Sequence, residues 1–254
     1  MNDSAAPEGA ALAPAARPAA PAGLHGLDAL FRPRSIAVIG ASRERGAIGA
    51  EIFHNLIEKG FAGVVYPVNR HADVVQSIRA YASLAQVPGP VDLAVVVVPA
   101  AAVIETVRGC GEKGVGAVVV ISAGFKEAGD EGRARERELV EVVRAYGMRL
   151  VGPNCLGVIN TEDAVRMDAT FAPAYPPGGK VAFSSQSGAL GLAILETATR
   201  LNLGVSHFVS VGNKADVSSN DLIEYWEQDP GTAVILLYLE SFGNPRRFTT
   251  IGGT

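Results

Sequence analysis

The chain has 254 residues, of which 48% are hydrophobic and 19% charged, with a formal net charge of -4. This is the composition of a soluble globular protein of one large or two modest domains. The acidic balance argues against nucleic acid or an anionic membrane as the main partner, because both require a concentrated excess of lysine and arginine. Two cysteines, Cys110 and Cys155, are too few for a disulfide framework and fit a reducing, cytoplasmic compartment.

Residues 1–26 are dominated by alanine and proline. The prolines break any helix, and the segment has neither the long apolar run of a membrane span nor the basic start of a secretory signal. We therefore expect a disordered tail ahead of the folded part, and no membrane partner.

From residue 27 onward, short apolar runs alternate with longer helical patterns, which is typical of a doubly wound α/β protein. Runs such as Ala-Val-Val-Val-Val at 94–98 have no polar face, which predicts strands of a parallel sheet buried on both sides. We predict strands over residues 35–39, 63–67, 93–98, 117–121 and 149–151, with helices over 47–59, 73–80, 101–113 and 131–146.

The first predicted strand ends at Gly40, and Gly46 and Gly49 follow before helix-forming sequence. A strand, a glycine loop and a helix in this order form the phosphate-binding start of a nucleotide-binding unit. The spacing G-x5-G-x2-G is longer than the dinucleotide pattern G-x-G-x-x-G, so the loop is wider and its ligand need not be a nicotinamide cofactor. An ordinary strand-to-helix turn without a ligand is the alternative on these residues alone.

Polar and small residues follow the next three predicted strands. Asn69 and Arg70 stand where NAD-binding proteins carry an acidic residue for the ribose hydroxyls. An amide and a cation suit a ribose phosphate, as in NADP or the 3′-phospho-ADP part of coenzyme A, although Arg70 is equally interpretable as a solvated loop cation. Pro99 and Ser122 follow the third and fourth strands, so these loops together predict an extended nucleotide site at one sheet edge.

A second α/β unit is predicted from residue 151, with strands over 180–184, 205–209 and 233–239 and helices over 190–201 and 221–228. The loop 184–188, Ser-Ser-Gln-Ser-Gly, lies between a strand and a helix. Its hydroxyls and backbone N–H groups can converge on a phosphate at the helix N-terminus, or one serine can simply cap the helix. A serine hydrolase is disfavoured, because the loop lacks the first glycine of G-x-S-x-G and no histidine stands in an evident triad context.

Five motifs in order resemble the N-terminal part of the ADP-forming acyl-CoA synthetases, the acetate–CoA ligases related to the succinyl-CoA synthetase α subunit. They are SIAVIGAS at 35–42, VGPNCLG at 151–157, SSQSG at 184–188, SVGNKAD at 210–216 and YLESF at 238–242. The resemblance implies a Rossmann-like, doubly wound CoA-binding domain over 27–150. It also implies a partial flavodoxin-like α/β ligase domain over 151–254 that is apparently truncated.

The resemblance also implies roles for individual residues. Those implied to bind coenzyme A are Gly40, Ser42, Asn69, Pro99 and Ser122, and those implied to hold phosphate are Ser185, Ser187 and Gly188. Glu240 matches the catalytic glutamate that orients a phosphohistidine, where a carboxylate fixes the tautomer of the imidazole. The alternative for Glu240 is a strand-end carboxylate in solvent. No metal site is expected in this chain.

In the resembling family, an acyl phosphate forms from acyl-CoA and phosphate, and a histidine carries the phosphoryl group to an ATP-grasp domain that binds ATP or ADP with Mg²⁺. Neither that histidine nor that domain is present in this sequence, and His207 lies inside a predicted strand, where we interpret it as structural. A sheet that ends at its third predicted strand would also leave an edge and an apolar surface uncovered.

We therefore expect a fragment or one part of a split enzyme that is inactive alone. Its ligands would be CoA and a small carboxylic acid, its partner an ATP-grasp domain or subunit, and its assembly oligomeric. An alternative of a different class is a CoA-sensing module fused to an acetyltransferase, without ligase turnover. A third, an NADP-linked oxidoreductase, is disfavoured by the glycine spacing.

Overall fold

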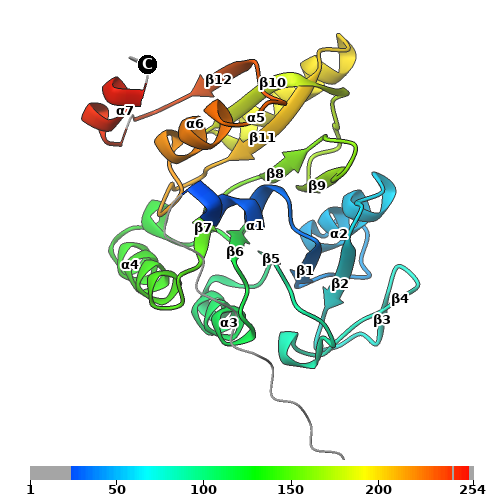
Figure 1. Ribbon diagram of the computed structural model, residues 1–254. Helices are drawn as coiled ribbons and strands as arrows, with labels where there is room; N and C mark the ends of the chain where they lie inside the picture. The colour runs from blue at the N-terminus through cyan, green and yellow to red at the C-terminus, as the bar shows by residue number, and fades with distance from the viewer. Residues whose placement is uncertain (1–23, 242, 252–254) are drawn as a thin grey trace, which may run out of the picture.

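The computed structural model describes residues 24–241 and 243–251. Most of the tail predicted over residues 1–26 therefore lies outside the described residues, while its end belongs to the short helix η1 (Leu24–Leu27), which α1 (Asp28–Phe31) follows. The described chain forms two five-stranded sheets, and α1 lies between them (Figure 1). No helix in the described ranges has the length and apolar character needed to cross a membrane.

The first sheet is parallel throughout, with the strand order β2-β1-β5-β6-β7. The predicted buried runs form these strands, and every residue of β1, β5 and β6 is buried. Because the chain winds from β1 to β2 on one side and from β5 to β7 on the other, the order switches between β1 and β5, where ligands of such sheets bind. The strands are β1 (Ser35–Ile39), β2 (Val64–Val68), β5 (Leu93–Val96), β6 (Ala117–Val120) and β7 (Arg149–Val151).

Helices cover both faces of the first sheet. The buried residues of α2 (Ile48–Glu58) pack in the core shared with α1, while those of α3 (Ala100–Lys113) and α4 (Asp130–Ala145) form a separate core on the opposite face. The short helices η2 (Leu84–Gln86) and η3 (Lys126–Ala128) lie in connecting segments. This two-sided cover explains why the strands of this sheet have no polar face.

The helix predicted over residues 73–80 is wrong. This segment forms a hairpin of β3 (Val74–Val75) and β4 (Ile78–Arg79). The two residues between these strands, Gln76 and Ser77, have φ values of 47° and 67°, the left-handed region that a tight hairpin turn requires. The β-branched residues of the hairpin favour extended backbone, and their short spacing was mistaken for a helical pattern.

The second sheet has the order β12-β10-β11-β8-β9. Its parallel part is the predicted one and contains β10 (Gly178–Ser185), β11 (Val205–Ser210) and β12 (Val234–Tyr238). Two antiparallel strands that the sequence analysis did not predict, β8 (Gly157–Asn160) and β9 (Met167–Thr170), extend it beyond β11. The flavodoxin-like part of the fold therefore carries an added antiparallel pair.

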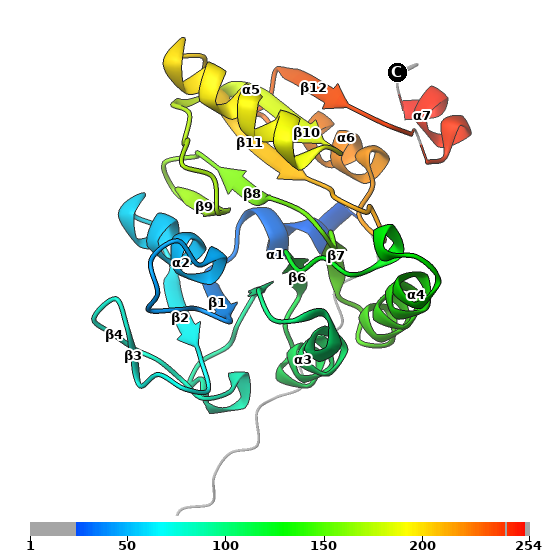
Figure 2. The same cartoon turned by 180° about the vertical axis from the view of Figure 1, so that it is seen from behind.

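Two helices connect the parallel strands of the second sheet. Helix α5 (Gly188–Arg200) lies across β10 and β11 in the rear view (Figure 2), and α6 (Ser219–Glu227) joins β11 to β12. Helix α7 (Pro245–Ile251) follows the last strand. Within the described residues β12 is an edge strand, and its side chains Val234, Leu236 and Tyr238 are exposed, as expected for an uncovered apolar surface.

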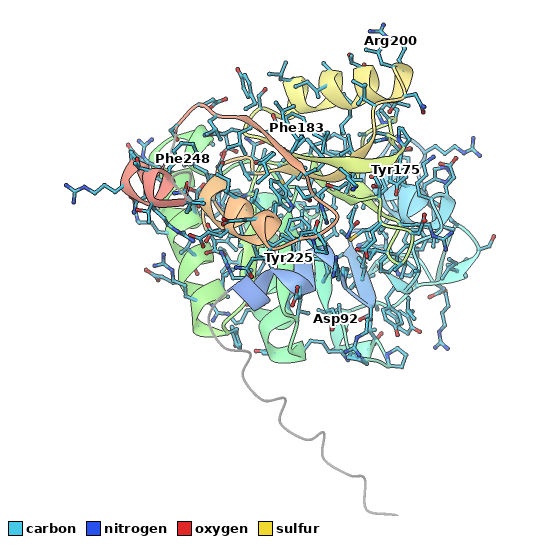
Figure 3. All side chains as sticks on the ribbon, turned by 45° about the horizontal axis from the view of Figure 1, so that its top comes forward. Asp92, Tyr175, Phe183, Arg200, Tyr225 and Phe248 are labelled. Carbon is cyan, nitrogen blue, oxygen red and sulfur yellow. The ribbon has the colours of Figure 1, made fainter. Side chains whose placement is uncertain are left out.

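The two sheets share one hydrophobic core through α1. Phe31 of α1 stacks on Tyr225 of α6 with ring centroids 4.7 Å apart, and it also contacts Trp226. The Tyr225 hydroxyl donates a hydrogen bond to Asp28 Oδ1 (3.2 Å), and Figure 3 shows Tyr225 between the ribbons of α6 and α1. Asn160 at the end of β8 donates through Nδ2 to the Phe31 carbonyl oxygen (2.8 Å). The two halves of the chain are therefore packed as one unit.

Candidate functional site

A cleft of about 880 Å³ lies where the carboxyl ends of the two sheets face each other. The first sheet contributes the loops after β5 and β6, and the second contributes the loops after β10, β11 and β12. Apolar side chains from both halves form part of its wall, namely Ile48, Leu156, Phe171 and Leu192. A large cleft with an apolar wall and polar loops at a switch point is the usual setting of a binding site in α/β proteins.

Gly40 ends β1 at the switch point, and its glycine character has a steric cause. Its φ is +96°, and an added Cβ would lie 2.1 Å from the carbonyl oxygen of Val97, beside β5. Gly49 in the first turn of α2 is equally constrained, because its Cβ would lie 2.1 Å from the carbonyl oxygen of Gly40. Gly40 and Gly49 therefore permit close approach of the strand, the loop and the helix, whatever ligand binds there.

Ser42 and Asn69 do not line the cleft; Asn69 links the loops after β1 and β2, and Ser42 bonds within its own loop. Asn69 donates through Nδ2 to the Ala41 carbonyl oxygen (2.6 Å) and accepts through Oδ1 from the His71 N–H (2.7 Å). Ser42 Oγ accepts from the Glu44 N–H (3.0 Å). Gly40 is also absent from the cleft wall, so these three predicted CoA contacts lie beside the cleft, at the end of the sheet formed by β1 and β2.

Pro99 and Ser122, the other predicted CoA contacts, do line the cleft. Pro99 is the N-cap of α3, so the first N–H groups of this helix start at the cleft. Ser122 donates through Oγ to the carbonyl oxygen of Val98 (2.6 Å), which ties the loop after β6 to the loop after β5. A helix N-terminus beside small residues is suited to bind a phosphate or a flat ring.

The predicted phosphate loop is brought to the same cleft. Gly188 begins α5 and lines the cleft, and an added Cβ there would meet no atom within 4 Å. Ser187 caps the helix, since its Oγ accepts from the Leu190 N–H (3.3 Å), as the capping alternative predicted. Ser185 is buried beneath the loop and donates to the Ser187 carbonyl oxygen (2.6 Å). Only Gly188 of these three residues lines the cleft, while the two serines shape the loop.

Glu240 lines the cleft from the end of β12 and is exposed, so both interpretations of this carboxylate place it at the solvent boundary. Gln186, for which no role was predicted, connects Glu240 to the predicted phosphate loop. The Gln186 Oε1 accepts hydrogen bonds from the N–H groups of Glu240 (3.1 Å) and Ser241 (3.3 Å). A glutamine between two serines in a strand-to-helix loop was the only sequence signal for this contact.

A polar network links the two halves across the cleft. Asn213, in the loop after β11, donates through Nδ2 to Glu127 Oε2 (2.6 Å) and Glu136 Oε2 (2.7 Å), while Lys126 Nζ donates to the Asn213 carbonyl oxygen. Burial alone would raise the pKa of Glu127, but the bond from Asn213 and two backbone N–H bonds hold that pKa below its ordinary value. The sequence analysis missed this network because its members are distant in the chain.

Cys155 lines the cleft, but its thiol is not a nucleophile. Its Sγ lies 3.3 Å from the Val120 carbonyl oxygen, and burial raises the pKa of the thiol to about 12. The group is therefore neutral near pH 7, and the thiolate form that would attack a carbonyl is not populated.

A second cleft, of about 450 Å³, lies at the opposite edge of the second sheet, around His207. His207 occupies β11 as predicted and is 2% exposed, with Nδ1 3.7 Å from Asp229 Oδ2. Burial lowers the pKa of His207 to about 4. The charge of Asp229 acts to raise this pKa, and the charge of Arg32 acts to lower it. Arg32 pairs with Asp229 (3.3 Å) and with Glu162 (3.0 Å). Arg32, Asp229 and Glu162 of this cleft are thus paired with one another.

Comparison with known protein families gives two matches along the chain. Residues 34–161 match the model described as a CoA binding domain, and residues 178–252 match the model described as a succinyl-CoA ligase like flavodoxin domain. The first match includes the switch point of the first sheet, and the second includes the phosphate loop and β12.

Similar proteins carry ligase names. The α subunit of acetate–CoA ligase [ADP-forming] II from Pyrococcus furiosus is 48% identical over 225 residues, covering 89% of this chain and 48% of the relative. Acetate–CoA ligase [ADP-forming] I from Archaeoglobus fulgidus is also 48% identical over 225 residues, covering 89% of this chain and 32% of the relative.

A solved structure extends this likeness to the fold. Dinucleotide-forming acetyl-coenzyme A synthetase 1 from Ca. Korarchaeum cryptofilum, in complex with phosphate and ADP, matches with a TM-score of 0.84 and 44% identity over 89% of this chain and 48% of that chain. The chain thus spans about a third to a half of the length of these relatives. By sequence and by fold, the chain belongs to the CoA binding domain family, and its CoA binding domain and succinyl-CoA ligase like flavodoxin domain are similar to those of ADP-forming acetate–CoA ligases.

Proposed function

We propose that this chain is the CoA-binding and partial ligase portion of an ADP-forming acyl-CoA synthetase. The complete enzyme would interconvert acyl-CoA, phosphate and ADP with a free acid, CoA and ATP. The observation that carries the proposal is the 880 Å³ cleft, in which Pro99 and Ser122 of the first sheet face Gly188 and Glu240 of the second. A nucleotide on one wall and a phosphate on the other would meet in a single cavity.

The reaction within this chain would be the phosphorolysis of a thioester. An oxygen of inorganic phosphate attacks the carbonyl carbon of acyl-CoA, the C–S bond breaks, and the departing thiolate takes the phosphate proton to give CoA and an acyl phosphate. The α5 N-terminus at Gly188 would bind the phosphate through its N–H groups. The apolar wall at Phe171 and Leu192 would keep water away from the acyl phosphate.

The later steps need groups supplied from outside the chain. Glu240 would orient the imidazole of a phosphohistidine that carries the phosphoryl group onward, and ATP or ADP with Mg²⁺ would bind an ATP-grasp domain or subunit. The name of the Pyrococcus furiosus relative, an α subunit, supports a partner subunit and an oligomeric assembly. A small carboxylic acid as substrate and a cytoplasmic location belong to the same proposal.

The relatives favour this function over a CoA-sensing module fused to an acetyltransferase, because those described above are ligases. The cleft supports the same choice. A module that only senses CoA has no need of a second wall formed by a helix N-terminus and Glu240.

Calorimetric titration of the chain with CoA, desulfo-CoA and NADP tests the proposal. CoA and desulfo-CoA should bind alike, since the sulfur is remote from the phosphates, and NADP should not bind. The variant Ala123→Asp places a carboxylate in the cleft wall and should weaken CoA binding about tenfold or more by repelling its phosphates. The control Ala134→Asp changes an exposed residue of α4 outside the cleft and should leave the affinity unchanged.

Absence of CoA binding by a folded wild-type chain would contradict the proposal. Tighter binding of NADP than of CoA would also contradict the proposal and would favour an NADP-linked oxidoreductase.

A further inference from the structure

Asn154 lines the large cleft with a side chain that forms no hydrogen bond among the described residues. It lies in the segment after β7 and is exposed. The neighbouring polar side chains of the wall are already engaged within the protein, namely those of Ser122, Cys155, Gln186 and Asn213. The carboxylate of Glu240 forms no hydrogen bond in the described chain either, but an ionised carboxylate can only accept one. The amide of Asn154 is therefore an uncharged donor and acceptor that is fully available to a ligand.

The backbone around Asn154 is bonded to both halves of the cleft. Its own N–H donates to the carbonyl oxygen of Ser122 (3.0 Å), in the loop after β6 of the first sheet. The carbonyl oxygen of Pro153, directly before it, accepts from the N–H of Asn213 (2.9 Å), in the loop after β11 of the second sheet. Asn154 is thus fixed at the place where the two walls of the cleft meet.

The two residues after Asn154 anchor this position further. Cys155 is buried in the core that the two sheets share, and Leu156 is buried in a separate core with residues of β10 and α5. Because the chain on either side is held, the amide of Asn154 reaches the cleft from a fixed backbone position. Such preorganisation is what a group needs in order to stabilise a charge that develops during a reaction.

The proposed reaction brings a developing charge to this place. If CoA lies along the wall of Pro99 and Ser122 and phosphate lies at Gly188, the thioester lies between them, where the two walls meet. When a phosphate oxygen adds to the carbonyl carbon, the electron pair of the C=O bond moves onto the carbonyl oxygen, and it returns as the C–S bond breaks. A hydrogen-bond donor directed at that oxygen stabilises the charged intermediate, and side-chain amides are donors of this kind.

We propose that the Asn154 amide donates through Nδ2 to the thioester carbonyl oxygen and stabilises the negative charge that this oxygen gains when phosphate attacks. This role rests on the proposed function and adds a catalytic residue to it. The α5 N-terminus then serves the phosphate, and Asn154 serves the acyl carbonyl.

The backbone of Asn154 offers a different reason for an asparagine here, and it also supplies a clean variant. Its φ is +58°, in the left-handed region that glycine adopts freely and asparagine adopts more readily than most residues. If only the backbone required asparagine, glycine would serve equally well. The variant Asn154→Gly keeps the backbone conformation and removes the amide.

The test is calorimetric titration with two unreactive CoA analogues. Acetyl-dethia-CoA has a CH₂ group in place of the sulfur, so phosphate cannot cleave its ketone, and S-ethyl-CoA has nearly the same length but no carbonyl. Asn154→Gly should weaken the binding of acetyl-dethia-CoA by about fivefold, the worth of one hydrogen bond, and leave S-ethyl-CoA unchanged. With a ¹³C label at the ketone, the carbonyl resonance should move downfield on binding to the wild type and should not do so in the variant.

Asn202→Gly is the matched control, because Asn202 is exposed with φ +55° and lies outside the cleft. It should change neither the affinities nor the ¹³C shift. The role of Asn154 is overturned if Asn154→Gly matches the wild type, if it loses both analogues equally, or if the bound wild type shows no downfield shift. If the folded wild type binds neither analogue, the proposed function fails and the role of Asn154 fails with it.

Discussion

The two clefts of the second sheet lie at opposite ends of its parallel strands and are built differently. At the carboxyl ends, glycines, small residues and the N-termini of α3 and α5 surround a space of about 880 Å³. At the amino ends, a space of about 450 Å³ is lined by His207 and by Arg32, Asp229 and Glu162, and Arg32 forms ion pairs with both carboxylates.

This difference separates the proposed binding site from a cleft whose ion pairs join structural elements. N–H groups at a helix N-terminus have no partner within their helix, so they are available to a ligand. An arginine already shared by two carboxylates has its strongest interactions satisfied and gains less from a new one. Substitutions at the first cleft should therefore mainly change ligand affinity, and substitutions at the second should mainly change the free energy of unfolding.

The largest expected effect is that of Gly40→Ala, beside the first cleft. Its Cβ would lie 2.1 Å from the Val97 carbonyl oxygen, so β1 and β5 must separate. We expect a loss of about 3 kcal/mol or more in the free energy of unfolding, with CoA binding abolished. Denaturant unfolding and CoA titration measure the two effects.

Gly46→Ala in the same loop is the matched control. Gly46 also has a positive φ, +81°, but nothing lies within 4 Å of an added Cβ. Gly46→Ala should lower the free energy of unfolding by only about 1 kcal/mol, because alanine disfavours the left-handed backbone conformation. Equal costs at the two positions would show that close packing at the switch point is not what requires Gly40.

A smaller effect is expected from Arg32→Ala at the second cleft. It removes the charged partner of Asp229, a nearly buried carboxylate that keeps only the bonds from Thr232 and Gly231, and should lower the free energy of unfolding by about 1–3 kcal/mol. Because the charge of Arg32 disfavours a second positive charge, the pKa of His207 should rise in this variant. An NMR titration of the histidine ring measures that rise.

Arg133→Ala is the control for charge removal, since Arg133 forms an exposed pair with Asp130 within one helix. Its cost should stay below about 0.5 kcal/mol. An unchanged His207 pKa in Arg32→Ala would contradict the electrostatic account of the second cleft.

The remaining effect concerns the pH dependence of the free energy of unfolding that His207 causes. Its folded pKa of about 4 lies below the ordinary value of 6.5, so the unfolded chain takes up a proton first as the pH falls. The stabilisation is present above pH 6.5 and is lost towards pH 4, with a slope of up to about 1.4 kcal/mol per pH unit. The variant His207→Gln should lack this component when unfolding is measured across the range.

The wild type must be compared with His207→Gln, because the titration of Asp168 changes the free energy of unfolding with pH in the opposite direction to that of His207. Burial raises the pKa of Asp168 to about 7, so its stabilisation is present below pH 3.8 and declines as the pH rises through 7. The difference between wild type and His207→Gln cancels this contribution. Parallel pH profiles of the two proteins would refute the assignment to His207.

The first sheet was largely predictable from sequence, whereas parts of the second were not. Runs such as 94–98 are apolar throughout, which only a two-sided burial explains. In contrast, β9 contains Asp168, a residue that strands disfavour, and its burial against the α1–α2 side of the core is a tertiary effect. The hairpin at 74–79 was missed because its turn uses Gln76 and Ser77 rather than the usual glycine or asparagine.

For the site, sequence motifs located the loops but not the contacts within them. Pro99, Ser122, Gly188 and Glu240 were predicted and share the cleft. The network of Asn213 with Glu127 and Glu136 could not be predicted, because it joins segments that only the packing of both sheets brings together.

The core shared through α1 has a consequence for how a ligand would be received. Stacking of Phe31 on Tyr225 and the bond from Asn160 fix the two walls of the large cleft relative to each other. We expect a cleft whose walls are held apart at a fixed distance to lose little protein conformational entropy when a ligand binds. Such a cleft selects its ligands by length, because reacting groups meet only if the bound molecule spans the distance from one wall to the other.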